Sequence, residues 1–202
     1  GVVAVRTGWL KRHYPVQFFA ALLNSVSSDS GKVAAYSQYC RKHGIPLLPP
    51  DINQSVRKFS VGRNAQGVSG IRFGLGAIKS CGDKAIDSII AQRRKGGPYK
   101  DIFDFCQRMD SEQVNKRVVE SLILSGAMDC TGARRTQLMA VYESALDGAA
   151  KSRRSNVVGQ MSLFGDGLLE EVKPTLPDIP EYNLRTMLSL EKNVTGLYIS
   201  GH

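Results

Sequence analysis

A glycine turn between two apolar segments carries the residues best suited to bind an anion. The turn is Ser80-Cys81-Gly82, and a helix is predicted directly after it, over Asp83–Arg94. The first amides of a helix lack an intrahelical partner and lie at the positive end of the helix dipole, so they favour a negatively charged ligand. Lys79 and Lys84 flank this turn. Phosphate, repeated along a nucleic-acid backbone, is the partner that the pattern predicts.

A second helix pair repeats the arrangement later in the chain. The first pair is predicted over residues 71–95 and the second over 117–146, with turns at Gly82 and Gly126. The second turn is longer and has Met128 where another glycine would be expected, so this pair is predicted mainly to complete a four-helix unit. The predicted DNA contacts are Lys79, Ser80, Cys81, Gly82, Asp83 and Lys84, with Arg134 and Arg135 as a second patch. A plain pair of helices with glycine caps is the alternative.

A short motif with two adjacent hydrophobes lies between two glycines after the helix pairs. It reads Gln160-Met161-Ser162-Leu163-Phe164. Such side chains in a polar segment need a partner or the helical body to cover them. A polar anchor beside two hydrophobes is typical of a peptide that fills a pocket on a partner. Packing onto the helical body is the alternative.

No catalytic or metal-binding cluster is predicted from the sequence. His13, His43 and His202 are far apart, and no Asp-x-Asp pair suggests two-metal phosphoryl transfer. Asp101 and Asp104 are explained by their position at the start of a helix. The cysteines form no C-x-x-C pair, which predicts buried free thiols in a reducing compartment; they are Cys40, Cys81, Cys106 and Cys130.

The distribution of charge favours a nucleic-acid partner. The 202 residues have a net charge of +9. Residues 1–155 hold 24 Lys and Arg against 12 Asp and Glu, whereas residues 156–202 hold 3 against 6. A basic body with a mildly acidic tail suits nucleic acid, although basic residues also simply solvate helix surfaces. No apolar run is long enough to span a membrane and no signal peptide is visible, so we expect no membrane partner and a cytoplasmic location.

The elements that position these residues are mostly helical. Apolar spacing and turn residues predict helices over 2–12, from Pro15 to Val26, and from Val33 to His43, and later at 102–106 and 183–193. An extended connector at 45–50 and a β-hairpin over 57–61 and 68–73 lie between them, and 151–181 reads as a linker. The predicted fold is mainly α with a small β-hairpin. Because the chain lacks an initiator methionine, we also expect it to be a piece of a longer protein.

The first helix pair resembles a helix-hairpin-helix motif, in which a glycine turn leads into a helix with apolar positions about four and seven residues later. Gly82, Ile86 and Ile89 fit this pattern, and Ser80 stands where its first glycine usually lies. Several further segments, taken in order, resemble the bacterial replicative DNA polymerase III alpha subunits. They are Trp9–Pro15, Gly44–Asn53, Phe73–Lys79, Asn115–Val118, Ser125–Asp129 and Gly196–His202.

The resemblance implies how the chain is divided and what it does. Residues 1–56 would be the helical end of the fingers region, 57–150 a β-hairpin with a tandem helix-hairpin-helix unit that binds DNA, 151–181 a linker, and 182–202 a helix leading to an OB-fold. Gln160, Leu163 and Phe164 match the family's sliding-clamp motif, Gln-x-x-Leu-Phe. The implied partners are the phosphate backbone of double-stranded DNA, the sliding clamp (beta subunit) and other replicase subunits.

The implied chemistry is template-directed DNA synthesis with Mg²⁺ by a palm upstream of this chain, in the bacterial cytoplasm at the nucleoid. No cofactor, metal or catalytic residue is expected within the chain itself. Two alternatives remain. One is a stand-alone helix-hairpin-helix protein of DNA repair, and the other is a protein-interaction scaffold with no DNA role.

Overall fold

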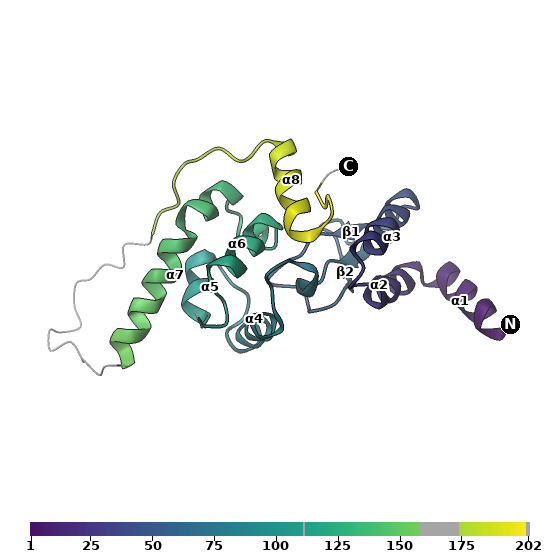
Figure 1. The fold of residues 1–202 in the computed structure, drawn as a ribbon, viewed down its shortest axis with the longest axis horizontal. Coiled ribbons are helices and arrows are strands. Elements are labelled where there is room, and N and C mark those ends of the chain that lie inside the picture. Colours follow the sequence, from purple (N-terminus) through teal and green to yellow (C-terminus); the bar gives the residue numbers. More distant parts are fainter. Residues whose placement is uncertain (111, 158–173, 201–202) are drawn as a thin grey trace.

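The protein is elongated, with a small sheet next to the second and third helices of the chain and a separate body of helices following it along the chain (Figure 1). The structure, a computed structural model, describes residues 1–110, 112–157 and 174–200, except the side chains of 155–157. The longer helices are α1 (Val2–His13), α2 (Pro15–Ser25), α3 (Ser30–Lys42), α4 (Asp83–Gly96), α5 (Ile102–Arg108), α6 (Lys116–Leu124), α7 (Arg135–Val157) and α8 (Leu184–Thr195). Single 3-10 turns are η1 (Leu75–Ala77) and η2 (Asp129–Thr131), and the strands are β1 (Leu47–Leu48), β2 (Ser60–Arg63) and β3 (Ser69–Arg72). The prediction of a mainly α fold with a β-hairpin is confirmed.

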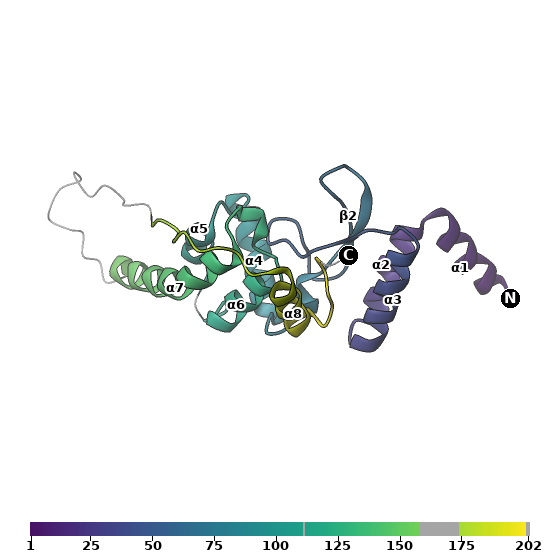
Figure 2. The same ribbon diagram turned by 90° about the horizontal axis from the view of Figure 1, so that it is seen from above.

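The N-terminal core joins the first helices to the sheet and to the end of the described chain. Pro15 begins α2 at a position where its missing N–H costs nothing. Asp29 begins α3 by accepting a hydrogen bond from the amide of Lys32. The buried residues of this core are Phe19, Ala20, Leu23, Val33, Cys40, Ile45, Phe59, Ile71, Phe73, Leu197 and Ile199. α1 contributes no buried residue and extends away from the body (Figures 1 and 2).

The sheet has three strands in the order β1-β3-β2. The predicted hairpin forms the antiparallel pair β2 and β3, with Val61 opposite Ile71. The proline-rich connector contributes the short parallel strand β1, with Leu47 opposite Ile71. β1 lies at an edge, the place in a sheet where neighbouring prolines are tolerated. The hairpin loop projects from the body (Figure 2).

A second core holds the two helix pairs together. The helices α4, α5, α6 and α7 bury their apolar faces against one another, with Ile86, Phe105, Leu122 and Leu138 among the fully enclosed side chains. Tyr99 adds a hydrogen bond from its hydroxyl to the carbonyl of Ile89, at 2.7 Å. This body carries both predicted turns, and it presents the start of α4 and the start of α7.

The segment before the first turn corrects one prediction. The pair predicted over residues 71–95 would have its first helix before the Ser80 turn, but only the single turn η1 forms there, shortly after β3. Gly74 and Gly76 lie against the preceding chain, where an added Cβ would come within 2.5 Å and 2.9 Å of the Arg57 carbonyl oxygen. This close backbone approach fixes the path of the chain as a strand followed by one tight turn.

The predicted linker is shorter at its start than expected. The sequence assigns residues 151–157 to it, but they continue α7. The final helix, expected over 183–193, is α8, which Asn183 caps at its start and Gly196 ends with φ +79°. Within the described ranges, no helix combines the length and apolar character needed to cross a membrane.

Candidate nucleic-acid interface

The start of α4 is open to solvent. Four other helices begin with an N-cap residue whose own side chain caps the helix, namely Asp29, Asp101, Asn115 and Asn183. α4 begins after Gly82 in an extended conformation, and no side chain of the described residues caps it. Lys79 and Lys84 are exposed on either side. The fold therefore places unsatisfied helix amides between two exposed cations, the arrangement that favours an anion.

Ser80 holds the turn in an unusual backbone conformation. Its φ is +66°, and among the described residues it is the one non-glycine residue with a positive φ. Glycine adopts this conformation without a steric penalty, which is the physical reason for a glycine in the corresponding place of the motif. The carbonyl of Ser80 accepts from the amide of Gly82 at 3.1 Å, so that amide closes the turn. Ser80 thus preserves the shape of the hairpin at an energetic cost.

Cys81 anchors the turn, because both its side chain and its amide are engaged within the protein. Its side chain is buried in the core of the helix pairs, and burial raises the pKa of the thiol to about 12. Its amide donates to the carbonyl of Ile78. The amide of Lys79 is also engaged, since it donates to the carbonyl of Val194 at 2.8 Å. The backbone donors left for an anion are those of the first turn of α4.

Arg57 lies beside the same turn and was missed by sequence reasoning. Its guanidinium forms ion pairs with Asp83 and with Asp87, the second at 2.5 Å. These bonds raise the pKa of Arg57, chiefly through the hydrogen bond to Asp87. Asp83 opposes a phosphate at the start of α4, and Arg57 offsets that charge. The spacing of Asp83 and Asp87 on one helix face was the available signal for a cation nearby.

Arg135, the second residue of the predicted basic patch, has a buried guanidinium. Its side chain is 3% exposed and pairs with Asp129 at 2.7 Å and with the fully buried Glu191 at 2.9 Å. Burial alone would lower the pKa of Arg135, but these two carboxylates raise it above its usual value. Gly126 makes room for the guanidinium, because a Cβ there would lie 2.4 Å from an Arg135 nitrogen.

Arg134 remains near the surface, but it is paired within the chain. One of its guanidinium nitrogens lies 3.1 Å from a carboxylate oxygen of Asp178 and donates to the carbonyl of Ile179 at 3.0 Å. Glu181 accepts from the amides of Arg135 at 2.7 Å and Thr136 at 3.4 Å. Carboxylates from a distant segment thus occupy the start of α7, whereas the first amides of α4 face solvent.

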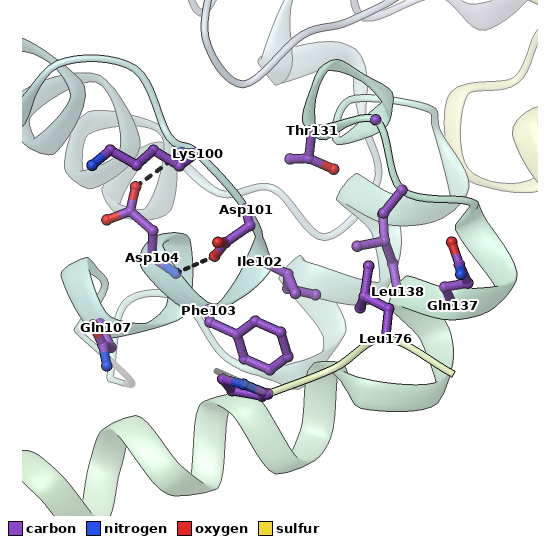
Figure 3. Close-up of a pocket in the computed structure, with 13 residues that line it drawn as sticks. Lys100, Asp101, Ile102, Phe103, Asp104, Gln107, Thr131, Gln137, Leu138 and Leu176 are labelled. Atoms are coloured by element: carbon purple, nitrogen blue, oxygen red, sulfur yellow. Dashed lines mark hydrogen bonds between the residues drawn. The ribbon is translucent and has the colours of Figure 1, made fainter. Parts of the chain in front are cut away.

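A hollow of about 590 Å³ lies between α5, the start of α7 and residues 174–176. Figure 3 shows the side chains of Ile102, Phe103, Leu138 and Leu176 facing this hollow, with Asp101 and Asp104 at its rim. Asp101 and Asp104 are engaged in capping the start of α5. Among the residues that the structure describes, no three His, Cys, Asp or Glu side chains gather as they would to hold a metal ion.

A sequence model of the helix-hairpin-helix motif matches residues 44–138, the region that contains this turn. Over its whole length, the chain is similar to proteins named DNA polymerase III subunit alpha. It is 39% identical to that of Vibrio cholerae, 42% to that of Deinococcus radiodurans and 41% to that of Thermus aquaticus. All of the chain is covered in each comparison, but it spans only 15–17% of these relatives. The resemblance inferred from the sequence is confirmed.

The Gln160–Phe164 motif lies outside the described residues. The structure therefore says nothing of Gln160, Met161, Ser162, Leu163 or Phe164, and their assignment as a clamp-binding motif stays a prediction.

Proposed function

We propose that this chain is the DNA-holding part of a replicative DNA polymerase alpha subunit and that it grips duplex DNA through phosphates. The observation that carries the proposal is the uncapped start of α4 between the exposed Lys79 and Lys84, within the matched helix-hairpin-helix region. The proposed contacts are the side chains of Lys79, Ser80 and Lys84 and the amides of Asp83 and Lys84, with Gly82 shaping the turn. None of these groups reads a base, so the binding is independent of sequence.

The polymerase chemistry belongs, in this proposal, to the part of the longer protein outside this chain. Template-directed DNA synthesis by two Mg²⁺ ions needs carboxylates gathered around the metals. The described residues do not provide such a group, so no step of the reaction is assigned to them. The proposed setting is the bacterial cytoplasm, with other replicase subunits docking through the longer protein.

The clamp partner is proposed for Gln160–Phe164. Gln160 would supply hydrogen bonds in a pocket of the sliding clamp, and Leu163 and Phe164 would supply buried apolar area. The motif follows the helix pairs directly in sequence, so a clamp bound there would be tethered close to the DNA grip.

A salt titration with duplex DNA tests the DNA contact. The double variant Lys79→Ala with Lys84→Ala loses up to two phosphate contacts, so the slope of log binding constant against log salt should become shallower by about two units, without any change in sequence preference. Lys42→Ala with Lys151→Ala is the matched control, because it removes the same charge at two exposed sites away from the turns.

The outcome separates the rival functions. If the Lys79 and Lys84 variant has the same slope as the control, the first turn is structural only. If the unmodified chain fails to bind duplex DNA at low salt, the scaffold alternative replaces this proposal. A stand-alone repair protein is disfavoured by the similarity to polymerase subunits along the whole chain.

A further inference from the structure

A short acidic segment lies across the second helix pair. We call residues 174–183 the strap. Its first part is apolar, with Leu176 half-buried at the hollow beside Leu138 (Figure 3). Its middle is held by a hydrogen bond from the side-chain amide of Gln137 to the carbonyl of Pro177, at 2.9 Å. Its last part carries the two acidic residues Asp178 and Glu181.

These two carboxylates engage two different kinds of donor. Asp178 pairs with the guanidinium of Arg134 at 3.1 Å. Glu181 accepts from the backbone amides of Arg135 and Thr136 at the start of α7. A flanking cation and the first amides of a helix are also the donors that the first turn offers to a DNA phosphate. The strap thus puts carboxylate oxygens where a phosphodiester would be bound.

We propose that the strap competes with the DNA backbone for the second helix pair. With the strap docked, α7 contributes nothing to DNA binding. With its acidic end displaced by a duplex already held at the first turn, Arg134 and the amides of Arg135 and Thr136 bind phosphate. This inference rests on the proposed function, because it presumes a duplex at the first turn.

Weak contacts hold the acidic end of the strap to the start of α7. Asp178 is 98% exposed and Arg134 is 48% exposed, and ion pairs this open to solvent are weak and screened by salt. Pro174, Pro177 and Pro180 have no N–H to donate, which limits the backbone hydrogen bonds that hold the strap. Leu176 is half-buried at the hollow, so the apolar end can stay in place while the acidic end lifts.

A duplex held at the first turn would raise the local concentration of phosphate at the second. Such intramolecular delivery makes a weakly held carboxylate replaceable without any new high-affinity contact. Arg135 itself takes no part through its side chain, since its guanidinium stays with Asp129 and Glu191.

The test compares two double variants of the full 202-residue chain with labelled duplex DNA across a salt series. Asp178→Asn with Glu181→Gln removes both competing charges, and Glu112→Gln with Glu120→Gln removes two charges elsewhere on the surface. At 0.1 M salt the first should bind duplex more tightly than the second, by about tenfold for each phosphate that the second helix pair newly binds. The slope against salt should also be steeper, by about one unit for each such phosphate. Adding Arg134→Gln to the first variant should remove much of this increase.

Hydrogen exchange on the unmodified chain gives an independent readout. DNA should speed exchange at the strap amides of Asp178, Ile179 and Tyr182 while slowing it at the start of α4. A strap that only braces the fold would instead give a lower melting temperature in Asp178→Asn with Glu181→Gln, DNA affinity equal to the control and no faster exchange. That result overturns the competition while leaving the proposed function intact. If the unmodified chain does not bind duplex at all, both proposals fail.

Discussion

At the scale of single residues, Ser80 lowers the stability of the first turn, because the shape of the turn requires a left-handed backbone at this position. Ser80 adopts φ +66°, and a residue with a Cβ pays about 1–2 kcal/mol for left-handed backbone geometry. The side chain is exposed and the residue is next to a buried cysteine that fixes the path of the chain. The backbone around Ser80 is therefore set by the packing of the hairpin and not by the preference of the residue itself.

Ser80→Gly should raise the free energy of unfolding by up to about 1 kcal/mol, because relief of strain outweighs the extra freedom that glycine gives the unfolded chain. Urea unfolding followed by circular dichroism measures this. Ser144→Gly in the middle of α7 is the matched control and should lower stability by about 0.5 kcal/mol, since helical geometry there favours a residue with a side chain. Loss of stability in Ser80→Gly would contradict the strain argument.

The exposure of the proposed DNA contacts was predictable where its determinant was local. Lys79 and Lys84 are exposed beside the first turn, as their spacing from the glycine indicates. Arg135 was not predictable, because its burial depends on Glu191, 56 residues further along the chain. The local sequence around Arg134 and Arg135 reads as a basic patch, and only the tertiary fold reveals which side chain is buried.

At the level of elements, a buried ion pair fastens the last helix to the second helix pair. Glu191 of α8 is fully buried and accepts from Arg135 of α7 at 2.9 Å. It also accepts from the amides of Ile199 at 3.0 Å and Ser200 at 2.9 Å. One carboxylate therefore fixes α8, the start of α7 and the segment after α8 relative to one another.

A double-mutant cycle tests this connection. Arg135→Met should cost about 3–5 kcal/mol, because it leaves the buried carboxylate of Glu191 without its ion-pair partner. Glu191→Leu should cost less, because Arg135 keeps its ion pair with Asp129. The double variant should cost less than the sum of the two by about 1–3 kcal/mol. Additive losses would show that the two residues act separately. Denaturant unfolding of all four proteins supplies the free energies.

The sequence predicted the types of most helices and strands, but it did not predict the contacts between segments that are far apart in the chain. Apolar spacing identified the helices α2, α3, α4 and α7, and the hairpin followed from two β-rich runs around a glycine-containing loop. The short turn η1 was missed because its geometry depends on the contact of Gly74 with the backbone of residues 57–58. The carboxylate cap on α7 was missed because Glu181 is far from Arg135 in sequence.

At the scale of the whole molecule, the proposed clamp motif should bind the sliding clamp with only modest affinity. Burying Leu163 and Phe164 contributes about 1.5–3 kcal/mol for each side chain. Ordering the segment costs on the order of 1 kcal/mol for each residue fixed. One motif of this kind binds weakly, and lasting attachment then depends on a second contact made by the same assembly.

Leu163→Ala with Phe164→Ala should abolish binding to the sliding clamp while the melting temperature and DNA affinity stay unchanged. Leu168→Ala with Leu169→Ala is the matched control and should bind the clamp normally. Surface plasmon resonance on immobilised clamp and a thermal melt measure both properties on the same samples. A destabilised Leu163 and Phe164 variant that still binds the clamp would show that these side chains pack on the helical body.

The joining of the two ends of the chain in one core has a consequence for synthesis on the ribosome. Leu197 and Ile199 pack with Phe19 and Leu23. At about 5–20 residues per second, roughly 10–40 seconds separate translation of the first members of this core from that of the last. The body of helix pairs, whose contacts lie between residues 52 and 149, can form during that interval. The first helices can already pack against the sheet residues of their own core, such as Ile71 and Phe73, and only the surface that Leu197 and Ile199 cover stays exposed until those two residues have been made.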